Sequence, residues 1–575
     1  MAQTTKLVGT MAMGIFLCML DTTVMNIALP AMQTGLSTDL AQLSWALNLY
    51  TILFATLTIP LGRIADIYGR QRVYLVGLGL FLGGSLVSGL AGNIGWLVGG
   101  RGIQSLGAAI VFPASMTIGI NSVPLAKRPQ TIATLGIAQG LAAALGPTIG
   151  GVVTQFLGWR GIFLINVPVT LLSLILCWRL FDPHEHRQPA EHLDLGGAVL
   201  SMTLLFSLTL LLVKGGDWGW TNLRCLGLGL LSSLALAGFL LVEAHTKHPM
   251  VPLMLFKDRQ FVGAAIMTVL SGIFLVALLV LMPSFFVKVQ LKGTLLAAMM
   301  VTPASVMIFI WSPLSGLLLA KLGPRLVILT GSLTMIGGYM VLARLNPNQY
   351  GQVLMAIVLI GAGYGIIIGP ITVLAAGEFT GKLLTASQSV IGVFRQVGTS
   401  LAVAIFVSAL STNLAIAKTN IRAFAQNEVA VLPVTAQVKR ESLVQVNDQL
   451  AAESLSQHPQ TTFIDQAKAN QLIQRHYQRA LVQQRLTQAP VPIKRAIYQR
   501  IERAVTRRVA HDNRALARLT AAIHHETKRQ LTRAFMRPYR LAMPFTLVML
   551  LTVFLLRRRR NYLERERIEN DHGFR

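Results

Sequence analysis

The chain has 575 residues, of which 53% are hydrophobic and only 13% are charged, and its mean hydropathy is +0.58. Soluble domains carry about 25% charged residues, so this composition excludes an ordinary soluble protein. The 50 Lys and Arg residues outnumber the 23 Asp and Glu residues, giving a net charge of +27. In a chain with many apolar segments this excess first indicates loop orientation, so no nucleic-acid partner is expected.

Apolar runs of about 20 residues recur along the chain, and each is long enough to cross a hydrocarbon core about 30 Å thick. The first run follows a short segment with one lysine and has no small-x-small cleavage pattern, so we expect it to be retained. The sequence predicts an all-α polytopic membrane protein with fourteen transmembrane helices, at 7–30, 44–62, 73–91, 95–117, 130–153, 161–181, 195–214, 221–243, 260–283, 293–320, 325–343, 352–377, 383–410 and 541–556.

The basic residues between these runs predict the orientation. With a cytoplasmic amino terminus, six basic loops lie inside, at 63–72, 127–128, 179–187, 247–259, 321–325 and 382. Lys288 and Lys292, in a short outer loop, go against this majority. Four arginines follow the last run at 557–560 and favour a cytoplasmic carboxyl terminus. We therefore expect a multi-pass protein of the cell membrane with both termini cytoplasmic.

A polar segment at 412–540 separates the thirteenth run from the last one. Its apolar residues recur at helical spacing, as in Ile493, Ile497 and Ile501, so it predicts long amphipathic helices. By parity the segment is extracytoplasmic, because long segments cross the membrane largely regardless of their charge. Two interpretations fit its basic composition: a solvated insertion without a ligand, or a surface for anionic lipid or an anionic cell-wall polymer.

These features divide the chain into five parts. We expect an N-terminal six-helix bundle at 1–181, a linker with an inserted helix pair at 182–259, five helices of a C-terminal bundle at 260–411, the basic helical insertion at 412–540, and the last helix with a basic cytoplasmic tail at 541–575.

The loop after the second run places an acid among three arginines and between two glycines. Glycines permit a tight turn, and the charges can act as a latch between helices. The residues predicted for this conformational latch are Gly62, Arg63, Asp66, Gly69, Arg70 and Arg72. Plain positive-inside anchoring is the alternative. Gly316 and Gly323 repeat the glycine spacing, with Ala320 in place of the acid, which indicates two related halves.

Asp21 and Arg101 are charged residues inside predicted spans. Asp21 lies roughly 21 Å from the cytoplasmic end of the first run and Arg101 roughly 10 Å from the outer end of the fourth, so the two share a depth. An intramembrane carboxylate must face a cavity, form a pair or become protonated. Asp21 is the predicted proton carrier, with Arg101 controlling its proton affinity; a structural ion pair that does not titrate is the alternative.

The fifth run carries small residues at four-residue spacing together with a proline. Such faces permit close helix packing, and a proline permits a kink, which suits a moving joint; plain tight packing is the alternative. The residues are Gly136, Gly140, Gly146, Pro147, Gly150 and Gly151.

Arg395 lies near the midplane in the thirteenth run, and spans nine to twelve contain no acid. Its partner is therefore expected to be backbone carbonyls, Asp21 or an anionic group of a substrate. Polar and aromatic residues that could line a substrate cavity, with packing as the alternative for each, are Asn26, Trp45, Asn48, Tyr50, Gln104, Gln139, Asn166, Arg395 and Gln396.

Metal and nucleotide chemistry are not expected. Cys18, Cys177 and Cys225 lack paired or ligand spacing, and no Walker sequence is present. Three histidines lie near two glutamates but without a helical i, i+4 frame: His184, His186 and His192.

Several motifs in order resemble the major facilitator superfamily and, within it, the fourteen-span drug/proton antiporter branch of EmrB/QacA-like proteins. They are Leu20-Asp21-Thr22-Thr23-Val24-Met25-Asn26-Ile27-Ala28-Leu29-Pro30 in the first run, the loop from Gly62 to Arg72, Arg101-Gly102-Ile103-Gln104-Ser105-Leu106-Gly107-Ala108-Ala109, the glycine motif of the fifth run, and Gly158-Trp159-Arg160 with Asn166-Val167-Pro168. Ser105 stands where the family more often has glycine. The resemblance covers 1–411 and 541–556, and nothing carries over to 412–540.

This resemblance implies two six-helix bundles plus an inserted helix pair, rocking around a midplane cavity. It implies a secondary transporter, not an enzyme, that exports hydrophobic or amphiphilic drugs and is driven by the proton gradient without a cofactor. It also implies that Asp21 and Arg101 matter for coupling and that the fifth-span glycines act in the outward/inward transition.

Two other functions remain open at this stage. One is a proton-coupled flippase or exporter of an endogenous lipid or envelope precursor, whose anionic head group the basic insertion would receive. The other is a membrane scaffold or sensor that does not transport. Since few membrane acids occur besides Asp21, we expect neutral, monocationic or anionic amphiphiles as substrates, and not multiply charged cations.

Overall fold

The computed structural model describes residues 2–38, 40–124, 127–181, 194–247, 249–377, 379, 381–451, 466–483 and 486–557. The chain divides into two compact units, unit 1 (Met1–Ala409 with Pro538–Arg575) and unit 2 (Leu410–Arg537). Within the described ranges every regular element is helical. His184, His186, His192 and the arginines at 558–560 lie outside the described residues.

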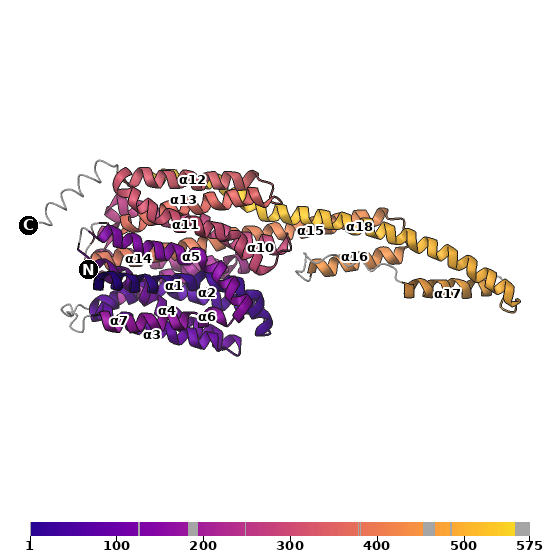
Figure 1. The fold of residues 1–575 in the computed structure, drawn as a ribbon, viewed down its shortest axis with the longest axis horizontal. Coiled ribbons are helices and arrows are strands. Elements are labelled where there is room, and N and C mark those ends of the chain that lie inside the picture. The colour runs from indigo at the N-terminus through magenta and orange to yellow at the C-terminus, as the bar shows by residue number, and fades with distance from the viewer. Residues whose placement is uncertain are drawn as a thin grey trace, which may run out of the picture. The chain divides into compact units, whose positions relative to one another are not determined.

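The first half of unit 1 is a helix bundle that covers the first six apolar runs (Figure 1). Its helices pack mainly as the pairs α3 with α4, α1 with α5 and α2 with α4. The sixth run is one continuous span, Gly161–Leu180, in which the helical residue Ile165 separates the short α6 from α7. The bounds are α1 (Ala2–Gly35), α2 (Leu40–Tyr68), α3 (Arg70–Gly89), α4 (Ile94–Asn121), α5 (Arg128–Leu157), α6 (Gly161–Leu164) and α7 (Asn166–Leu180).

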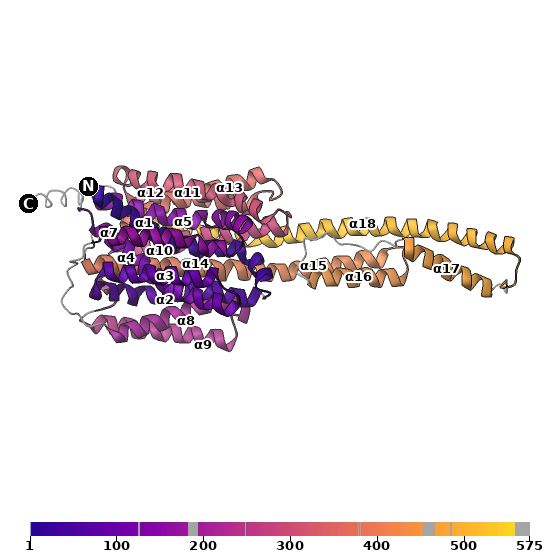
Figure 2. The ribbon, with the colours of Figure 1, turned by 60° about the horizontal axis from the view of Figure 1, so that its bottom comes forward.

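Helices α8 (Leu195–Trp218) and α9 (Leu223–His245) form an antiparallel pair at the edge of unit 1, where α8 packs against α2 (Figure 2). Each begins with a side-chain cap: Asp194 accepts a hydrogen bond from the backbone N–H of Gly197, and Asn222 from that of Arg224. Leucines along α9 are exposed, as expected of a helix that faces lipid.

The second half of unit 1 is a bundle of later helices. Its last helical segment follows unit 2 in the chain and begins at Pro538. The Tyr539 hydroxyl of this segment donates a 3.1 Å hydrogen bond to the carbonyl of Ala277, and Arg325 donates to the carbonyls of Val553 and Phe554. The elements are η2 (Leu253–Lys257), α10 (Arg259–Lys288), α11 (Thr294–Leu322), α12 (Pro324–Arg344), α13 (Tyr350–Ala376), α14 (Gly381–Ala402), the π-helix η3 (Val403–Val407), the end of α18 (Val491–Thr546) and α19 (Val548–Val553).

The predicted class, an all-α polytopic membrane protein, is confirmed. In the described chain twelve helices are long and apolar enough to cross a membrane, and counting the bent α5 makes thirteen. The predicted number of fourteen is not confirmed. The last run contains Pro544 and is divided between the end of α18 and the six-residue α19, so no single helix covers it.

Unit 2 is built from α15 (Ser408–Val431), α16 (Ala436–Ala451), α17 (Gln466–Gln483) and most of α18. It has its own apolar core, made by one face of α15, α16 and α18. The buried residues of that core recur at helical spacing, while arginines occupy other faces of α18: Ile421, Ala425, Val429, Val446, Leu516, Leu519 and Ile523.

One face of unit 1 carries the loop between α2 and α3, and we name it the latch face. Pro252 lines a small cavity there together with Arg63, and Asp258, six residues later, pairs with Arg557 at 3.3 Å. The start of α1 lies at the same face, because Gly14 packs against Tyr74 near the start of α3. Both ends of the described chain are therefore on the latch face.

Candidate functional site

Asp21 of α1 and Arg101 of α4 form an ion pair inside the N-terminal bundle, through Oδ2 and Nη1. Both side chains are about 1% exposed. The other carboxylate oxygen, Oδ1, accepts hydrogen bonds from Gln104 at 2.9 Å and from Asn166 at 3.4 Å. Gln104 also accepts from Arg101 at 2.7 Å. Four of the predicted site residues are thus in one network, and the buried charges of Asp21 and Arg101 compensate each other.

Aromatic rings cover the guanidinium group of Arg101. Its Cζ lies 4.0 Å from the ring centre of Tyr50 and 5.7 Å from that of Phe163, distances at which the ring faces stabilise a cation. Its Nε donates a 3.4 Å hydrogen bond to the carbonyl of Ala46. The arginine is therefore held in one orientation, with its charge directed at Asp21.

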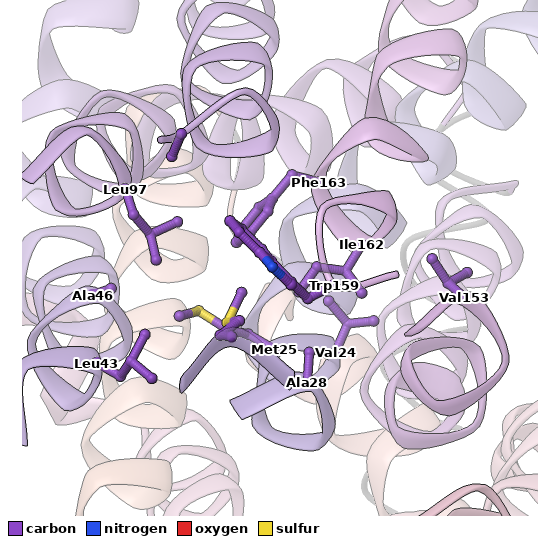
Figure 3. Close-up of a cluster of buried hydrophobic side chains, with 12 residues drawn as sticks. Val24, Met25, Ala28, Leu43, Ala46, Leu97, Val153, Trp159, Ile162 and Phe163 are labelled. Atoms are coloured by element: carbon purple, nitrogen blue, oxygen red, sulfur yellow. The ribbon is translucent and has the colours of Figure 1, made fainter. Parts of the chain in front are cut away.

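An apolar cluster lies beside the network (Figure 3). Its residues on α1 follow Asp21 and those on α2 lie near the start of that helix, so the cluster is on the side away from the latch face. The Trp159 ring sits at its centre. It lies between Phe163 on one side and Met25 and Ala28 of α1 on the other. Such a cluster excludes water, so a proton reaching Asp21 from that side requires these side chains to separate.

The predicted latch residues contact α14 of the opposite bundle. Asp66 accepts hydrogen bonds from Arg70 Nε at 2.7 Å and from Thr385 Oγ1 at 3.0 Å, and Arg70 Nη2 donates to the carbonyl of Gly381 at 3.3 Å. A methyl group at Gly62 would lie 2.7 Å from Oγ of Ser389, so glycine allows α2 and α14 to approach closely.

The remaining latch residues have different positions. Arg63 is buried beside Asp66, and Arg72 is exposed. Gly69 has φ 100°, a left-handed value that favours glycine at the turn between two helices. The weak repeat predicted from Gly316 and Gly323 occupies the related place in the second half. Gly323 has φ 79°, and a methyl group at Gly316 would lie 3.4 Å from Ala133 of α5.

Helix α5 contacts both bundles through its two glycine pairs. Methyl groups at Gly136 and Gly140 would lie 3.1 Å from Thr372 of α13 and 3.2 Å from Ile308 of α11. Gly146 and Gly150 instead face α1, where added methyl groups would overlap Thr23 and approach the carbonyl of Val24 to 2.6 Å. The first glycine pair therefore packs against the C-terminal bundle, and the second packs against α1 of the N-terminal bundle.

A bend of 46° separates the two faces of α5, between Gln130–Ala142 and Leu145–Leu157. Pro147 lies just beyond it, and its missing N–H and its ring account for the bend. Gly151 is buried one residue after Gly150. On the same half of α5, Thr148 Oγ1 and Thr302 Oγ1 of α11 are 2.6 Å apart, a further polar contact between the bundles, far from the latch face.

Arg395 lies on α14 and is 8% exposed. Its Nε and Nη2 are buried and have no hydrogen-bond partner among the described residues. The structure does not bring it to Asp21, whose oxygens are occupied by the network of α4 and α7.

The other cavity candidates are scattered. Gln139 is buried with its Oε1 unpartnered within the described ranges, and Gln396 is buried. Trp45 is exposed at the start of α2, with Lys214 of α8 5.1 Å from its ring centre, and Asn48 is half-buried. The side chain of Asn26 lies outside the described residues.

Sequence reasoning missed several residues that complete these contacts. Thr385, Ser389 and Thr302 are partners from the second bundle, and a hydroxyl on an apolar helix carries no signal of its own. Glu243 at the end of α9 is another: its carboxylate accepts the backbone N–H groups of Met250 at 3.1 Å and Val251 at 3.3 Å. As an acid in an apolar helix, Glu243 could have been recognised.

Unit 2 contains a cleft of about 430 Å³ between α16, α17 and α18. Lys468, Arg475 and Arg508 line it together with Glu441 and Asp512. Because both signs of charge are present, the lining does not select for an anionic polymer over other polar ligands.

A helical protein with two membrane-embedded bundles, glycine-mediated contacts between them and a buried charge network belongs to the class of two-bundle membrane transporters. Residues 11–403 match the model of the Major Facilitator Superfamily. The chain belongs to this superfamily, as its resemblance implies, and it is a multi-span membrane transporter.

Curated relatives are similar over the same part of the chain. The multidrug resistance protein Stp of Mycobacterium tuberculosis (strain CDC 1551 / Oshkosh) is 30% identical over 403 residues, 69% of this chain and 74% of that protein. The multidrug transporter protein MdtP of Bacillus subtilis (strain 168) is 28% identical over 396 residues, and the tetracenomycin C resistance and export protein of Streptomyces glaucescens is 28% identical over 395 residues. Each of these two alignments covers 68% of this chain and 73% of the relative.

Among solved structures, the proton:xylose symporter XylE bound to 6-bromo-6-deoxy-D-glucose matches with a TM-score of 0.52 and 15% identity, covering 72% of this chain and 90% of that chain. At this identity the likeness supports the fold alone. The EmrB/QacA-like branch stays a prediction.

Proposed function

We propose that this protein exports hydrophobic or amphiphilic compounds across the cell membrane in exchange for protons. Relatives of this chain are named for multidrug resistance, for multidrug transport, and for resistance to and export of tetracenomycin C, which supports the direction and the substrate class. The latch face is the cytoplasmic side in this proposal, because the basic loops favour it.

The position of Asp21 next to the joint between α1 and α5 carries the proposal. Thr23 and Val24 follow Asp21 directly and pack against Gly146 and Gly150 of α5. Protonation of Asp21 would remove the charge that Arg101, Gln104 and Asn166 hold in place, so α1 would lose its fixed position against α4 and α7.

Helix α5 extends this effect to the other bundle. It contacts α11 and α13 through Gly136, Gly140 and Thr148, so a shift of α1 against Gly146 and Gly150 changes the contact between the bundles. Two discrete packings of this joint, biased by the proton on Asp21, are what alternating access requires. The latch pair Asp66 and Thr385 would then break when the latch face opens.

The test is proton release from everted membrane vesicles with an imposed pH gradient, on addition of lipophilic dyes and antibiotics. We expect compounds that collapse the gradient with the native chain to be without effect with Asp21→Asn. The matched control is Asp448→Asn, which removes an exposed acid of unit 2. Equal responses of the native chain and Asp21→Asn would contradict Asp21 as the proton carrier. No response of the native chain to any compound would contradict proton-coupled export of these compounds.

A further inference from the structure

Arg395 is a buried cation whose charge is not compensated within the C-terminal bundle. Its Nε and Nη2 lack partners in the described part of the chain, although the side chain is more than nine-tenths buried. The helices α10, α11, α12, α13 and α14 contain no Asp or Glu at all. Tyr364 of α13 is close enough to interact electrostatically, but a phenol does not carry a compensating charge at neutral pH.

Asp21, the acid in the N-terminal bundle that was a predicted partner of Arg395, already has partners of its own. Asp21 pairs with Arg101 and accepts from Gln104 and Asn166. An unpaired charge in the membrane interior costs several kcal/mol, so such residues generally face a cavity or a ligand. This arginine is therefore better explained by a ligand that binds it during transport than by a role in packing.

Neighbouring glycines show where Arg395 points. Gly392, three residues earlier, faces Phe112 of α4 and Thr58 of α2 in the N-terminal bundle, and Gly398, three residues later, faces Val269 of α10. At 100° per residue, the side chain of Arg395 projects between these two directions. It therefore lies at the junction between the two bundles, where a major facilitator transports its substrate.

The depth of Arg395 agrees with such a position. It lies ten residues beyond Thr385 of the latch, about 15 Å along α14. Phe112 lies eleven residues from Arg101 along α4 and contacts Gly392, so Arg395 is about 12 Å from the level of Arg101. Arg395 is therefore between the closed latch and the Asp21 network, near the membrane midplane.

We propose that Arg395 binds an oxyanion of the transported compound, so that amphiphiles with a carboxylate, sulfonate or phosphate group are the preferred substrates. The planar guanidinium donates parallel hydrogen bonds to such a group, and the buried Nε and Nη2 are the two donors that a bidentate oxyanion uses. This inference deepens the proposed export function and rests on it.

The test compares two fluorescent probes, N-dansyl-leucine and its methyl ester, in which one methyl group converts the carboxylate into a neutral ester. Binding to the purified, detergent-solubilised full chain is followed by dansyl fluorescence. We expect the native protein to bind the carboxylate at least about tenfold more tightly than the ester, since the ester cannot offer the charged acceptor that strengthens a hydrogen bond from arginine. Arg395→Gln should abolish this preference without weakening the binding of the ester. Arg395→Lys should keep part of it, because the ammonium group retains the charge but not the planar fork.

The midpoint of thermal unfolding, measured on the same preparations, shows whether each variant is folded. The midpoint of Arg395→Gln should be unchanged or higher, because the variant removes an uncompensated buried charge. The matched control is Arg344→Gln, which removes an exposed arginine at the end of α12 in the same bundle and should leave both probes unaffected.

Three outcomes would overturn the inference: no binding of the carboxylate by the native chain, equal affinity for the two probes, or an equal loss of both in Arg395→Gln. The vesicle test separates this failure from failure of proton-coupled export. If compounds release protons through Asp21 but Arg395→Gln keeps the anion preference, proton-coupled export is supported and the anion site is contradicted. If binding of the carboxylate probe depends on Arg395 but no compound releases protons, the anion site is supported and proton coupling is contradicted.

Discussion

Thr385 of α14 donates a 3.0 Å hydrogen bond to the carboxylate of Asp66 at the end of α2, and this bond joins the two bundles at the latch face. The two residues are 319 positions apart in the chain. Arg70 holds the same carboxylate from within the first bundle and reaches the carbonyl of Gly381 in the second. Opening of the latch face must break both interbundle contacts.

Thr385→Val should therefore loosen the latch while leaving the Asp66–Arg70 pair intact. Loss of a hydrogen bond to a charged group weakens the closed state by about 1.5–3 kcal/mol, on the order of tenfold or more in the population of the open state. The measurement is the rate at which an impermeant maleimide labels a cysteine placed at Ala386, which lines the small cavity of about 20 Å³ at the latch. Thr334→Val, which removes an exposed hydroxyl bonded only within α12, is the control. Unchanged labelling would show that this bond does not hold the latch closed.

Asp21→Asn should destabilise the protein as well as uncouple it. The substitution leaves the Arg101 charge buried without its partner, and such losses amount to about 3–5 kcal/mol. The double variant Asp21→Asn with Arg101→Gln should recover a large part of the loss in thermal stability, because no uncompensated charge remains, yet it should release no protons. A double variant that regains proton release would show that Asp21 serves architecture and is not the carrier.

The sequence predicted that Asp21 and Arg101 share a depth, because depth can be counted along two apolar runs. It predicted the faces of α5 because small residues recur every four positions. It could not assign Thr385, Ser389 or Thr302 as partners, since those contacts depend on how one bundle meets the other. Apolarity defined the last run as one span, whereas Pro544 divides it between α18 and α19.

Gly150→Ala should stabilise neither α5 nor its contact with α1, although alanine has the higher helix propensity. The added methyl group would lie 2.6 Å from the carbonyl oxygen of Val24, and a backbone atom cannot rotate away as a side chain can. We expect a loss of about 1–3 kcal/mol and impaired transport. Gly79→Ala on α3 is the control, because a methyl group there meets nothing within 4 Å. Equal thermal midpoints and transport rates for the two variants would refute close packing at this joint.

Glu243→Gln should loosen the linker between α9 and α10, residues 246–258. Both carboxylate oxygens of Glu243 accept backbone N–H groups, of Met250 and Val251, and these two residues line the small cavity beside Asp66. A glutamine retains one acceptor and turns an NH2 group toward the second N–H, so about 1–3 kcal/mol is lost locally. Hydrogen exchange at residues 250–251 should accelerate in the variant, whereas the exposed control Glu428→Gln should leave it unchanged. Because the linker borders the latch, we expect maleimide labelling at Ala386 to accelerate together with the exchange. Faster exchange with unaltered labelling would mean that the linker and the latch move independently, and that the inserted pair α8 and α9 is not connected to the opening of this face.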